Sequence, residues 1–134
     1  MLKKIEAVIR EDKLGDVKQA LDNAGIMGLN ICEVRGRGRQ GGITLAGRSG
    51  GYQVGMLPKL QLNIVLSERN LDETAAAILR GARTGDAGDG LIFVYPVDEV
   101  IRIRTGERGR DAVMYPGDID DLHKNSQPGL KPAG

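Results

Sequence analysis

The sequence predicts an α+β sandwich, and three observations carry that prediction. The chain holds two strand–helix–strand units of similar size, over about 2–35 and 59–97, and each changes from a two-residue to a helical hydrophobic period. Its 134 residues suit a single domain with an aliphatic core, since aromatic residues make up only 3%. Two such units favour a ferredoxin-like βαββαβ fold, with four antiparallel strands and both helices on one face.

The first unit occupies the N-terminal quarter of the chain. Residues 3–11 alternate as a strand does, which places Ile5, Ala7 and Ile9 on one face. From Asp12 the spacing becomes helical, and Gly25 is suited to follow the helix end. Residues 28–34 are again typical of a strand. The apolar helix positions are Leu14, Val17, Leu21 and Ala24.

The second unit repeats the plan. Residues 59–66 alternate as a strand and 90–97 form an apolar run of strand length. Between them, 70–82 predicts a helix capped by Asn70 with Glu73 three residues later. The buried helix stripe is expected at Ala75, Ile78, Leu79 and Ala82.

An additional C-terminal strand is expected over 99–105. Ile101 and Ile103 alternate there with Arg102 and Arg104, so that the two arginines share one face.

Two segments lie outside the predicted core. A long glycine-rich loop over about 37–56 separates the two units, and loops of this length are usually functional or disordered. Residues 1–110 are expected to form the domain, and 111–134 a largely flexible extension rich in Pro and Gly.

Composition excludes several classes of protein. The single cysteine, Cys32, excludes an intrachain disulfide and is expected to be a small buried hydrophobe. No apolar run approaches 18 residues and no signal peptide is evident, so we expect a cytoplasmic protein. The net charge of +1 gives no overall attraction to polyanions, which leaves only local patches.

The stretch "GRGRQGG" at 36–42 satisfies the dinucleotide pattern GxGxxG, but its context does not. That pattern requires a helix to begin at the last glycine, and more glycines follow here instead. Between Arg35 and Lys59 the chain carries arginines at 35, 37, 39 and 48 and no acidic residue. Exposed backbone N–H groups and guanidinium forks are suited to an anion or an acidic partner surface.

A second glycine cluster, "TGDAGDG" at 84–90, precedes a predicted strand. Gly and Asp are common in turns, but three glycines exceed what a turn needs and would let a ligand approach the backbone. Together with Arg102 and Arg104, the cluster indicates a polyphosphate ligand.

No catalytic set can be assembled from the sequence. His123 is the only histidine and has no Cys or His near it, which argues against a zinc site and a hydrolase triad. No residue stands out as a base that would activate water for ATP hydrolysis. We therefore expect a protein that is not an enzyme, with no catalytic residues and no structural metal.

These motifs resemble those of the P-II signal-transduction family, the nitrogen regulators, from Met1 to about Arg110. The resemblance is carried by "KKIEAVIREDKLGDVKQAL", "EVRGRGRQGG", "LPKLQLNIVL" and "ARTGDAGDGLIFVYPVDEVIRIRTGE". It implies a homotrimer of ferredoxin-like subunits that binds ATP or ADP between neighbours. It also implies that the 37–56 loop, the T-loop, docks on a transporter or enzyme of nitrogen metabolism.

The resemblance also implies roles for particular residues. Gln40 matches a glutamine that helps to bind Mg²⁺ and 2-oxoglutarate, and Lys59 matches a lysine that meets the effector carboxylate. Asn30 and Val65 fall near the adenine. The nucleotide-binding positions as a set are Asn30, Gly36, Arg37, Gly38, Arg39, Gln40, Val65, Gly88, Asp89, Gly90, Arg102 and Arg104.

The chain departs from the family pattern at several positions. Leu91 stands where a lysine usually follows "GDG", which removes a phosphate contact. Tyr52 occupies the position uridylylated in some relatives, but the usual "YRGAEY" reads "GRSGGY" here. Two positions that are usually acidic in the loop are Leu45 and Gly55, and a purely cationic loop favours an acidic partner.

Two further interpretations stay open. Divergent P-II-like regulators are linked to bicarbonate uptake, metal efflux and nitrogenase control. A ferredoxin-like sheet with a Gly/Arg loop is also compatible with an RNA-binding module, for which Phe93 and Tyr95 would be the stacking residues. The near-neutral charge and the absence of the expected strand motif disfavour RNA, so no nucleic acid is expected.

Overall fold

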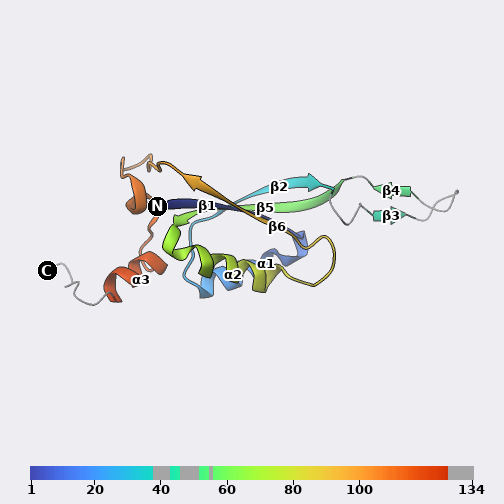
Figure 1. Ribbon diagram of the computed structural model, residues 1–134, viewed down its shortest axis with the longest axis horizontal. Helices are drawn as coiled ribbons and strands as arrows, with labels where there is room; N and C mark the ends of the chain where they lie inside the picture. The colour runs from blue at the N-terminus through green and yellow to red at the C-terminus, as the bar shows by residue number, and fades with distance from the viewer. Residues whose placement is uncertain (38–42, 46–51, 55, 127–134) are drawn as a thin grey trace.

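The computed structural model describes residues 1–37, 43–45, 52–54 and 56–126. Its centre is a four-stranded antiparallel sheet in the order β2-β5-β1-β6 (Figure 1). This arrangement confirms the predicted ferredoxin-like βαββαβ fold. The strands are β1 (Leu2–Ile9), β2 (Asn30–Gly36), β5 (Leu57–Ser67) and β6 (Gly90–Val97).

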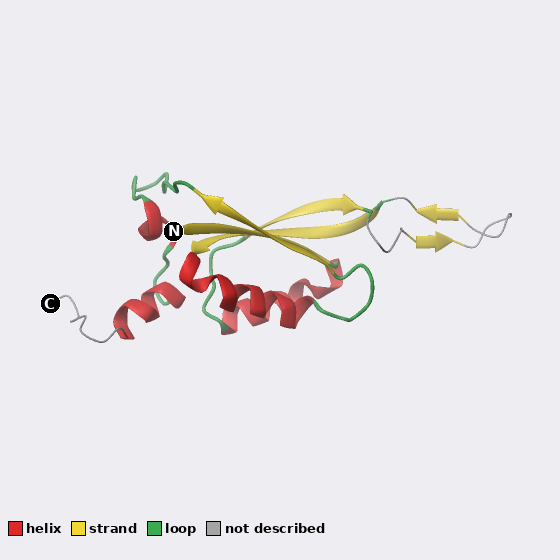
Figure 2. Ribbon diagram, in the orientation of Figure 1, coloured by secondary structure: helices red, strands yellow, loops and turns green. Residues whose placement is uncertain are grey.

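The two long helices, α1 (Leu14–Asn23) and α2 (Leu71–Ala82), cover one face of this sheet (Figure 2). The register aligns the apolar positions of adjacent strands, because Ile5 pairs with Ile64 and Ala7 with Leu62. Side chains two residues apart therefore face the helices together. The buried core includes Ile5, Ile9, Val17, Leu21, Leu62, Ile64 and Ile78.

The buried stripe of α2 is rotated from the predicted one. Ile78 and Ala82 are buried as expected, but Leu79 is 44% exposed. The reason is Gly81, where an added Cβ would lie 2.6 Å from Val17 Cα. Because α1 approaches the backbone of α2 at this glycine, the face bearing Gly81 is buried and Leu79 turns outward.

The predicted cap at Asn70 is wrong, although α2 does begin after this residue. A 3₁₀ turn (η2, Glu68–Asn70) precedes α2, and the Asn70 side chain makes no capping hydrogen bond. Its buried amide instead donates to Asp120 Oδ1 at 2.9 Å. By contrast, Gly25 follows α1 as predicted, at a φ of 79°, and Ile26 N donates to Leu21 O at 2.9 Å.

Within the 37–56 segment, two short strands form a ribbon that the sequence did not predict. β3 (Ile43–Leu45) pairs antiparallel with β4 (Tyr52–Val54), with Ile43 opposite Val54. In Figure 1 this ribbon lies beyond the ends of β2 and β5, away from the helices.

The expected strand over 99–105 is wrong. Ile101 makes one isolated bridge to Arg108, and the chain reverses between them. Arg102 N donates to Glu107 O at 2.9 Å, and Gly106 N to Arg102 O at 2.8 Å. Gly106 adopts a φ of 73°, which permits this tight turn. The alternating Ile and Arg residues therefore lie in a turn and do not belong to a sheet.

Residues 111–126, which were expected to belong to a largely flexible extension, contain defined helical elements. A 3₁₀ turn (η3, Gly109–Val113) and a helix (α3, Ile119–Ser126) follow the turn. Ile119 is buried, and its N–H donates to Gly25 O at 2.8 Å. Residues 127–134 lie outside the described part of the chain.

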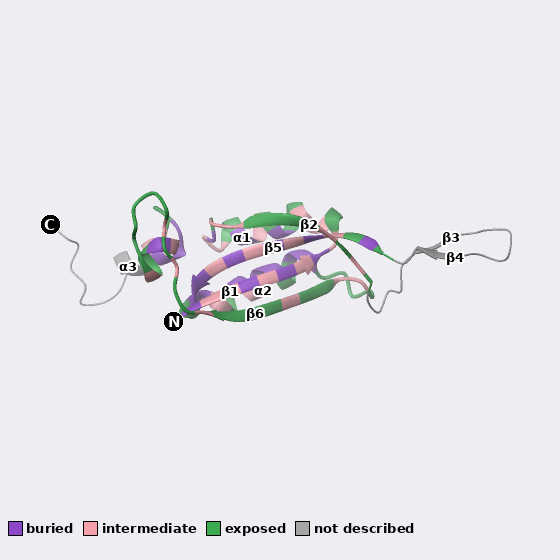
Figure 3. Ribbon diagram, turned by 90° about the horizontal axis from the view of Figure 1, so that it is seen from above, coloured by how far each residue is buried: buried purple, intermediate pink, exposed green. Residues whose placement is uncertain are grey.

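The second face of the sheet is open in this single chain, as Figure 3 shows for the edge strands β2 and β6. It carries Phe93 and Tyr95, each 42% exposed. Cys32 also lies on β2 and is exposed, which corrects the expectation that it is buried. An edge strand covered on one face cannot bury every apolar position by itself.

Candidate functional site

A pocket of about 590 Å³ lies where the end of β2, the start of β5 and the turn before β6 meet. We call it the glycine-turn pocket. Five of the residues predicted to bind the nucleotide line this pocket together with Lys59, and these six residues come from three segments that are distant in sequence. The five predicted residues are Gly36, Arg37, Gly88, Asp89 and Gly90, and the other walls include Val8, Leu57, Leu91 and Phe93.

The turn over 84–90 is organised around the carboxylate of Asp89. Its Oδ2 accepts hydrogen bonds from the backbone N–H groups of Thr84 and Gly85, each at 2.8 Å. Its Oδ1 accepts from the Thr84 hydroxyl and from Arg10 Nε at 3.0 Å. The hydrogen bonds from Thr84 hold the pKa of Asp89 well below its ordinary value. The Asp89 side chain thus fixes the turn.

Two glycines in this turn adopt backbone angles that L-residues rarely take. Gly88 has a φ of 95° and Gly90 a φ of 110°. A Cβ at Gly90 would lie 1.7 Å from Val8 O, so this position admits no side chain. These glycines therefore have two roles: they permit the backbone angles of the turn, and Gly90 lets β6 pack closely against β1.

Two cationic side chains line the pocket opposite the turn. Lys59 Nζ donates to Gly88 O at 2.7 Å, which ties β5 to the turn. Burial, followed by the nearby Arg10 charge, lowers the pKa of Lys59. Arg37 is exposed at the end of β2. Guanidinium and ammonium groups beside glycine N–H groups are suited to an anion.

Asn30 and Val65 belong to a second pocket of about 450 Å³, which we call the Asn30 pocket. In the β2–β5 ladder, Asn30 pairs with Asn63, whereas Gly36 pairs with Leu57. At about 3.3 Å per residue, Leu57 and Val65 are about 26 Å apart along β5. One chain therefore presents its two sets of predicted nucleotide-binding residues at opposite ends of the sheet.

Arg102 and Arg104 line neither of these pockets. Arg102 Nη2 donates to Ala112 O at 2.9 Å and Met114 O at 3.2 Å, and its guanidinium lies 5.2 Å from the ring centre of Tyr115. Arg104 is exposed and makes no ion pair within the described residues.

Gly38, Arg39 and Gln40 lie outside the described residues, so their predicted roles stay predictions. The backbone of Tyr52 begins β4.

Several residues of these pockets were not predicted from the sequence. Arg10 follows β1 and reaches Asp89 across 79 positions of sequence, and the signal available was a lone basic residue after a strand. Tyr115 lines the Asn30 pocket from a segment that was expected to be flexible. Neither contact has a local sequence pattern.

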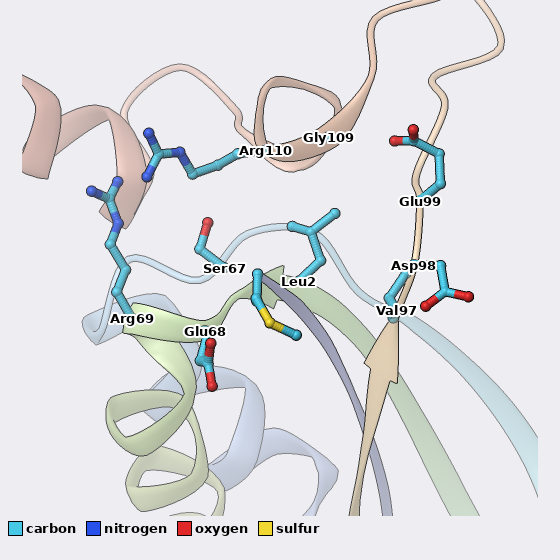
Figure 4. A pocket seen from close by; sticks show the side chains of 10 residues that line it. Leu2, Ser67, Glu68, Arg69, Val97, Asp98, Glu99, Gly109 and Arg110 are labelled. Atoms are coloured by element: carbon cyan, nitrogen blue, oxygen red, sulfur yellow. The ribbon is translucent and has the colours of Figure 1, made fainter.

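A third pocket, of about 730 Å³, lies between the core and the extension and contains none of the predicted site residues (Figure 4). Arg69 and Arg110 lie on one side of it, and Asp98 and Glu99 on the other. Charges of both signs line this pocket, as they line the glycine-turn pocket, where Asp86 and Asp89 lie beside Arg37 and Lys59.

Within the described residues, no group of three His, Cys, Asp or Glu side chains is placed to hold a metal ion. No helix there is long and apolar enough to cross a membrane.

The fold and the glycine-turn pocket together describe a ferredoxin-like domain with a pocket lined by glycines and charged side chains beside a protruding ribbon. The sequence model of the family "Nitrogen regulatory protein P-II" matches residues 2–107. The chain belongs to the P-II family of nitrogen regulatory proteins, as its motifs predicted. P-II proteins are homotrimeric signal transducers and not enzymes, in agreement with the expectation from the sequence.

Individual relatives agree with this assignment. The chain is 53% identical over 112 residues to nitrogen regulatory protein P-II 1 of Methanothermobacter thermautotrophicus, which covers 84% of this chain and 97% of the relative. It is 51% identical over 112 residues to the nitrogen regulatory protein P-II of Nostoc punctiforme, and this alignment covers 84% of this chain and 100% of the relative. The crystal structure of Arabidopsis thaliana PII bound to citrate matches with a TM-score of 0.69 and 37% identity, covering 83% of this chain and 91% of that one.

The C-terminal extension has no counterpart in that family match, which ends at residue 107. The two relatives are covered almost completely, while about a sixth of this chain lies outside the alignments. Most of the extension is therefore a feature of this chain beyond the shared domain.

Proposed function

We propose that this chain is a P-II-type regulator that binds ATP or ADP between subunits of a homotrimer and controls a target protein through the 37–56 segment. The family as a whole binds these nucleotides and 2-oxoglutarate and acts on target proteins. The observation that carries the proposal for this chain is the glycine-turn pocket, in which Arg37 and Lys59 face a turn with positive φ at Gly88 and Gly90.

The chemistry of this pocket suits the phosphates of a nucleotide. Arg37 is a rigid guanidinium donor, and the backbone near Gly88 can approach a ligand closely because no Cβ intervenes. Leu91, where relatives carry lysine, removes one cation but adds an apolar wall. Arg37 and Lys59 supply positive charge for an anion, while the Asp89 carboxylate in the same pocket is already hydrogen-bonded by Arg10, Thr84 and Gly85.

A trimer would unite the two sets of residues that one chain keeps apart. The glycine-turn pocket and the Asn30 pocket are separated by more than the length of a nucleotide along the same strands. Two neighbouring subunits that contribute opposite ends of their sheets would place the phosphates on one chain and the base on the other. Arg102 and Arg104 would reach the phosphates from the same side as the base.

The effector and the partner form the finer part of this proposal. Mg²⁺ and 2-oxoglutarate would be held near Gln40, and Lys59 would meet a carboxylate of the effector. The 37–56 segment contains no acidic residue, so its target surface should be acidic. Effector binding changes target affinity only if the effector favours one arrangement of this segment.

The proposal is tested by calorimetric titration of the purified protein with ADP and with ATP. We expect saturable binding of at least one nucleotide below millimolar concentration. Arg37→Gln should weaken it about tenfold or more, since a charge-assisted hydrogen bond contributes about 1.5–3 kcal/mol.

Arg35→Gln is the matched control, because it makes the same change two residues earlier, on β2, at a residue that does not line the pocket. Equal losses in the two variants, or no binding by the unmodified protein, would contradict the proposed function.

A further inference from the structure

Tyr115 lies in the part of the chain that extends beyond the P-II family match, yet it lines a pocket of the shared domain. Its ring forms a wall of the Asn30 pocket together with Leu29, Asn30 and Val65. Tyr115 is 39% exposed, so one part of the ring is packed and another is open to the pocket.

The Tyr115 ring packs against the backbone of the core at Gly28. A Cβ at Gly28 would lie only 2.6 Å from a ring carbon of Tyr115, so the ring rests directly on this glycine. On another side the Arg102 guanidinium lies 5.2 Å from the ring centre, within the range of a cation–π contact. The ring is therefore fixed in position before any ligand arrives.

The backbone of this segment is also fixed. Arg102 donates both of its Nη2 hydrogen bonds to Ala112 O and Met114 O, on the chain just before Tyr115. Tyr115 N donates to Asp118 Oδ2 at 2.7 Å. Arg102 thereby acts as a positioning residue for Tyr115. With both Nη2 hydrogens engaged, Arg102 would reach a phosphate through Nη1 alone and not through a bidentate fork.

The walls of the Asn30 pocket suit a planar, partly polar ring. Val65, Val100 and Val113 supply apolar surface, and the amides of Asn30 and Asn63 converge on the same space. Asn63 Nδ2 donates to Asn30 Oδ1 at 3.0 Å, which orients the Asn30 amide. The Asn30 Nδ2 group has no hydrogen-bond partner among the described residues, so it is available to a ring nitrogen.

We propose that Tyr115 is an additional ligand-contacting residue of the nucleotide site, on which the purine ring of the bound nucleotide stacks. This inference rests on the proposed function and assigns the extension a part in it. The extension would contribute a wall that selects for an aromatic base, and docking of the extension and nucleotide binding would strengthen each other.

The test compares ADP binding to the full chain and to two variants at position 115 by calorimetry. Tyr115→Leu should raise the Kd for ADP about fivefold or more, because a base loses its stacking partner. Tyr115→Phe keeps the ring and should stay within about twofold of the unmodified protein. Inorganic tripolyphosphate, which has no base, should bind the unmodified protein and Tyr115→Leu equally.

A fluorescence experiment measures contact between the base and the side chain directly. The chain contains no Trp, so Tyr115→Trp introduces a single reporter. ADP should quench its emission and tripolyphosphate should not. Thermal unfolding of each variant, measured without ligand, establishes that the variant is folded.

The outcomes separate this inference from the proposed function. If the unmodified protein binds ADP and Tyr115→Leu binds it equally or more tightly, Tyr115 is no ligand contact and the inference is overturned alone. If quenching by ADP and by tripolyphosphate is the same, it is overturned as well. If the unmodified protein binds no nucleotide, the proposed function fails and this inference with it.

Discussion

Arg69 and Asp120 form an ion pair that joins the ferredoxin-like core to the C-terminal extension. Arg69 Nη2 and Nε lie 2.7 Å and 3.1 Å from Asp120 Oδ1, which also accepts a hydrogen bond from Asn70 Nδ2. Asp120 is 3% exposed, so its charge depends on these donors for compensation. The extension is thus attached to the core by a specific polar contact beside the buried Ile119.

Asp120→Ala should lower the free energy of unfolding by about 2 kcal/mol, measured by urea denaturation at fixed protein concentration. The change leaves the buried Asn70 amide without its acceptor and Arg69 without its counter-ion. The expected loss is below that of a fully buried pair, because the Arg69 side chain is 29% exposed.

Asp22→Ala is the control for this variant, since Asp22 is exposed and makes no ion pair within the described residues. Its effect should stay within about 0.5 kcal/mol. Similar losses in the two variants would show that the extension is not held by Asp120.

Gly90→Ala should lower the free energy of unfolding by about 3 kcal/mol or more, because the new Cβ meets Val8 O and the φ of 110° disfavours alanine. Gly15→Ala is the matched change at an open site, since nothing lies within 4 Å of its added Cβ on α1. That variant should gain about 0.5–1 kcal/mol from helix propensity. A mild effect at Gly90 would refute the close approach of β6 to β1.

The carboxylate of Asp89 should make stability depend on acid pH. Its hydrogen bonds with Thr84, Gly85 and Arg10 lower its pKa in the folded protein, so its stabilising contribution is present above the unfolded pKa of about 4 and is lost as pH falls below it. Unfolding midpoints of the unmodified protein and of Asp89→Asn should therefore differ by a constant amount above about pH 5 and approach each other as pH falls below about 4. Asp86→Asn, in the same turn, provides the comparison, and a gap that stays constant as pH falls below about 4 would contradict this role.

The open face of the sheet should be the contact between subunits. Tyr95 lies there, and a hydrogen bond with Glu6 raises its pKa. Light scattering should give three times the chain mass of 14.4 kDa for the unmodified protein. Tyr95→Asp should lower this mass, since it places a second acid beside Glu6. Leu122→Asp, at an exposed position of α3, should remain trimeric, and a trimeric Tyr95→Asp would move the contact elsewhere.

Local sequence determined most of the architecture of this protein. The sequence pattern predicted which residues are buried, because the period of apolar residues matches the period of the strand or helix that buries them. Ile5, Ala7 and Ile9 alternate as in a strand, Val17 and Leu21 have helical spacing, and all five are buried. The sequence also indicated a special backbone conformation at the glycine cluster, and Gly88 and Gly90 do adopt positive φ angles that other residues rarely take.

The tertiary structure alone decided how these elements meet. Alternation at 101–104 predicted a strand, but backbone hydrogen bonds from Arg102 N to Glu107 O and from Gly106 N to Arg102 O close a turn instead. Asn70 matched a capping signal, yet its amide pairs with Asp120, 50 positions away. Tyr115 reaches the Asn30 pocket from a segment whose composition indicated flexibility. In each case a contact between residues distant in sequence outweighed a local preference of smaller energy, and no short-range pattern encodes such a contact.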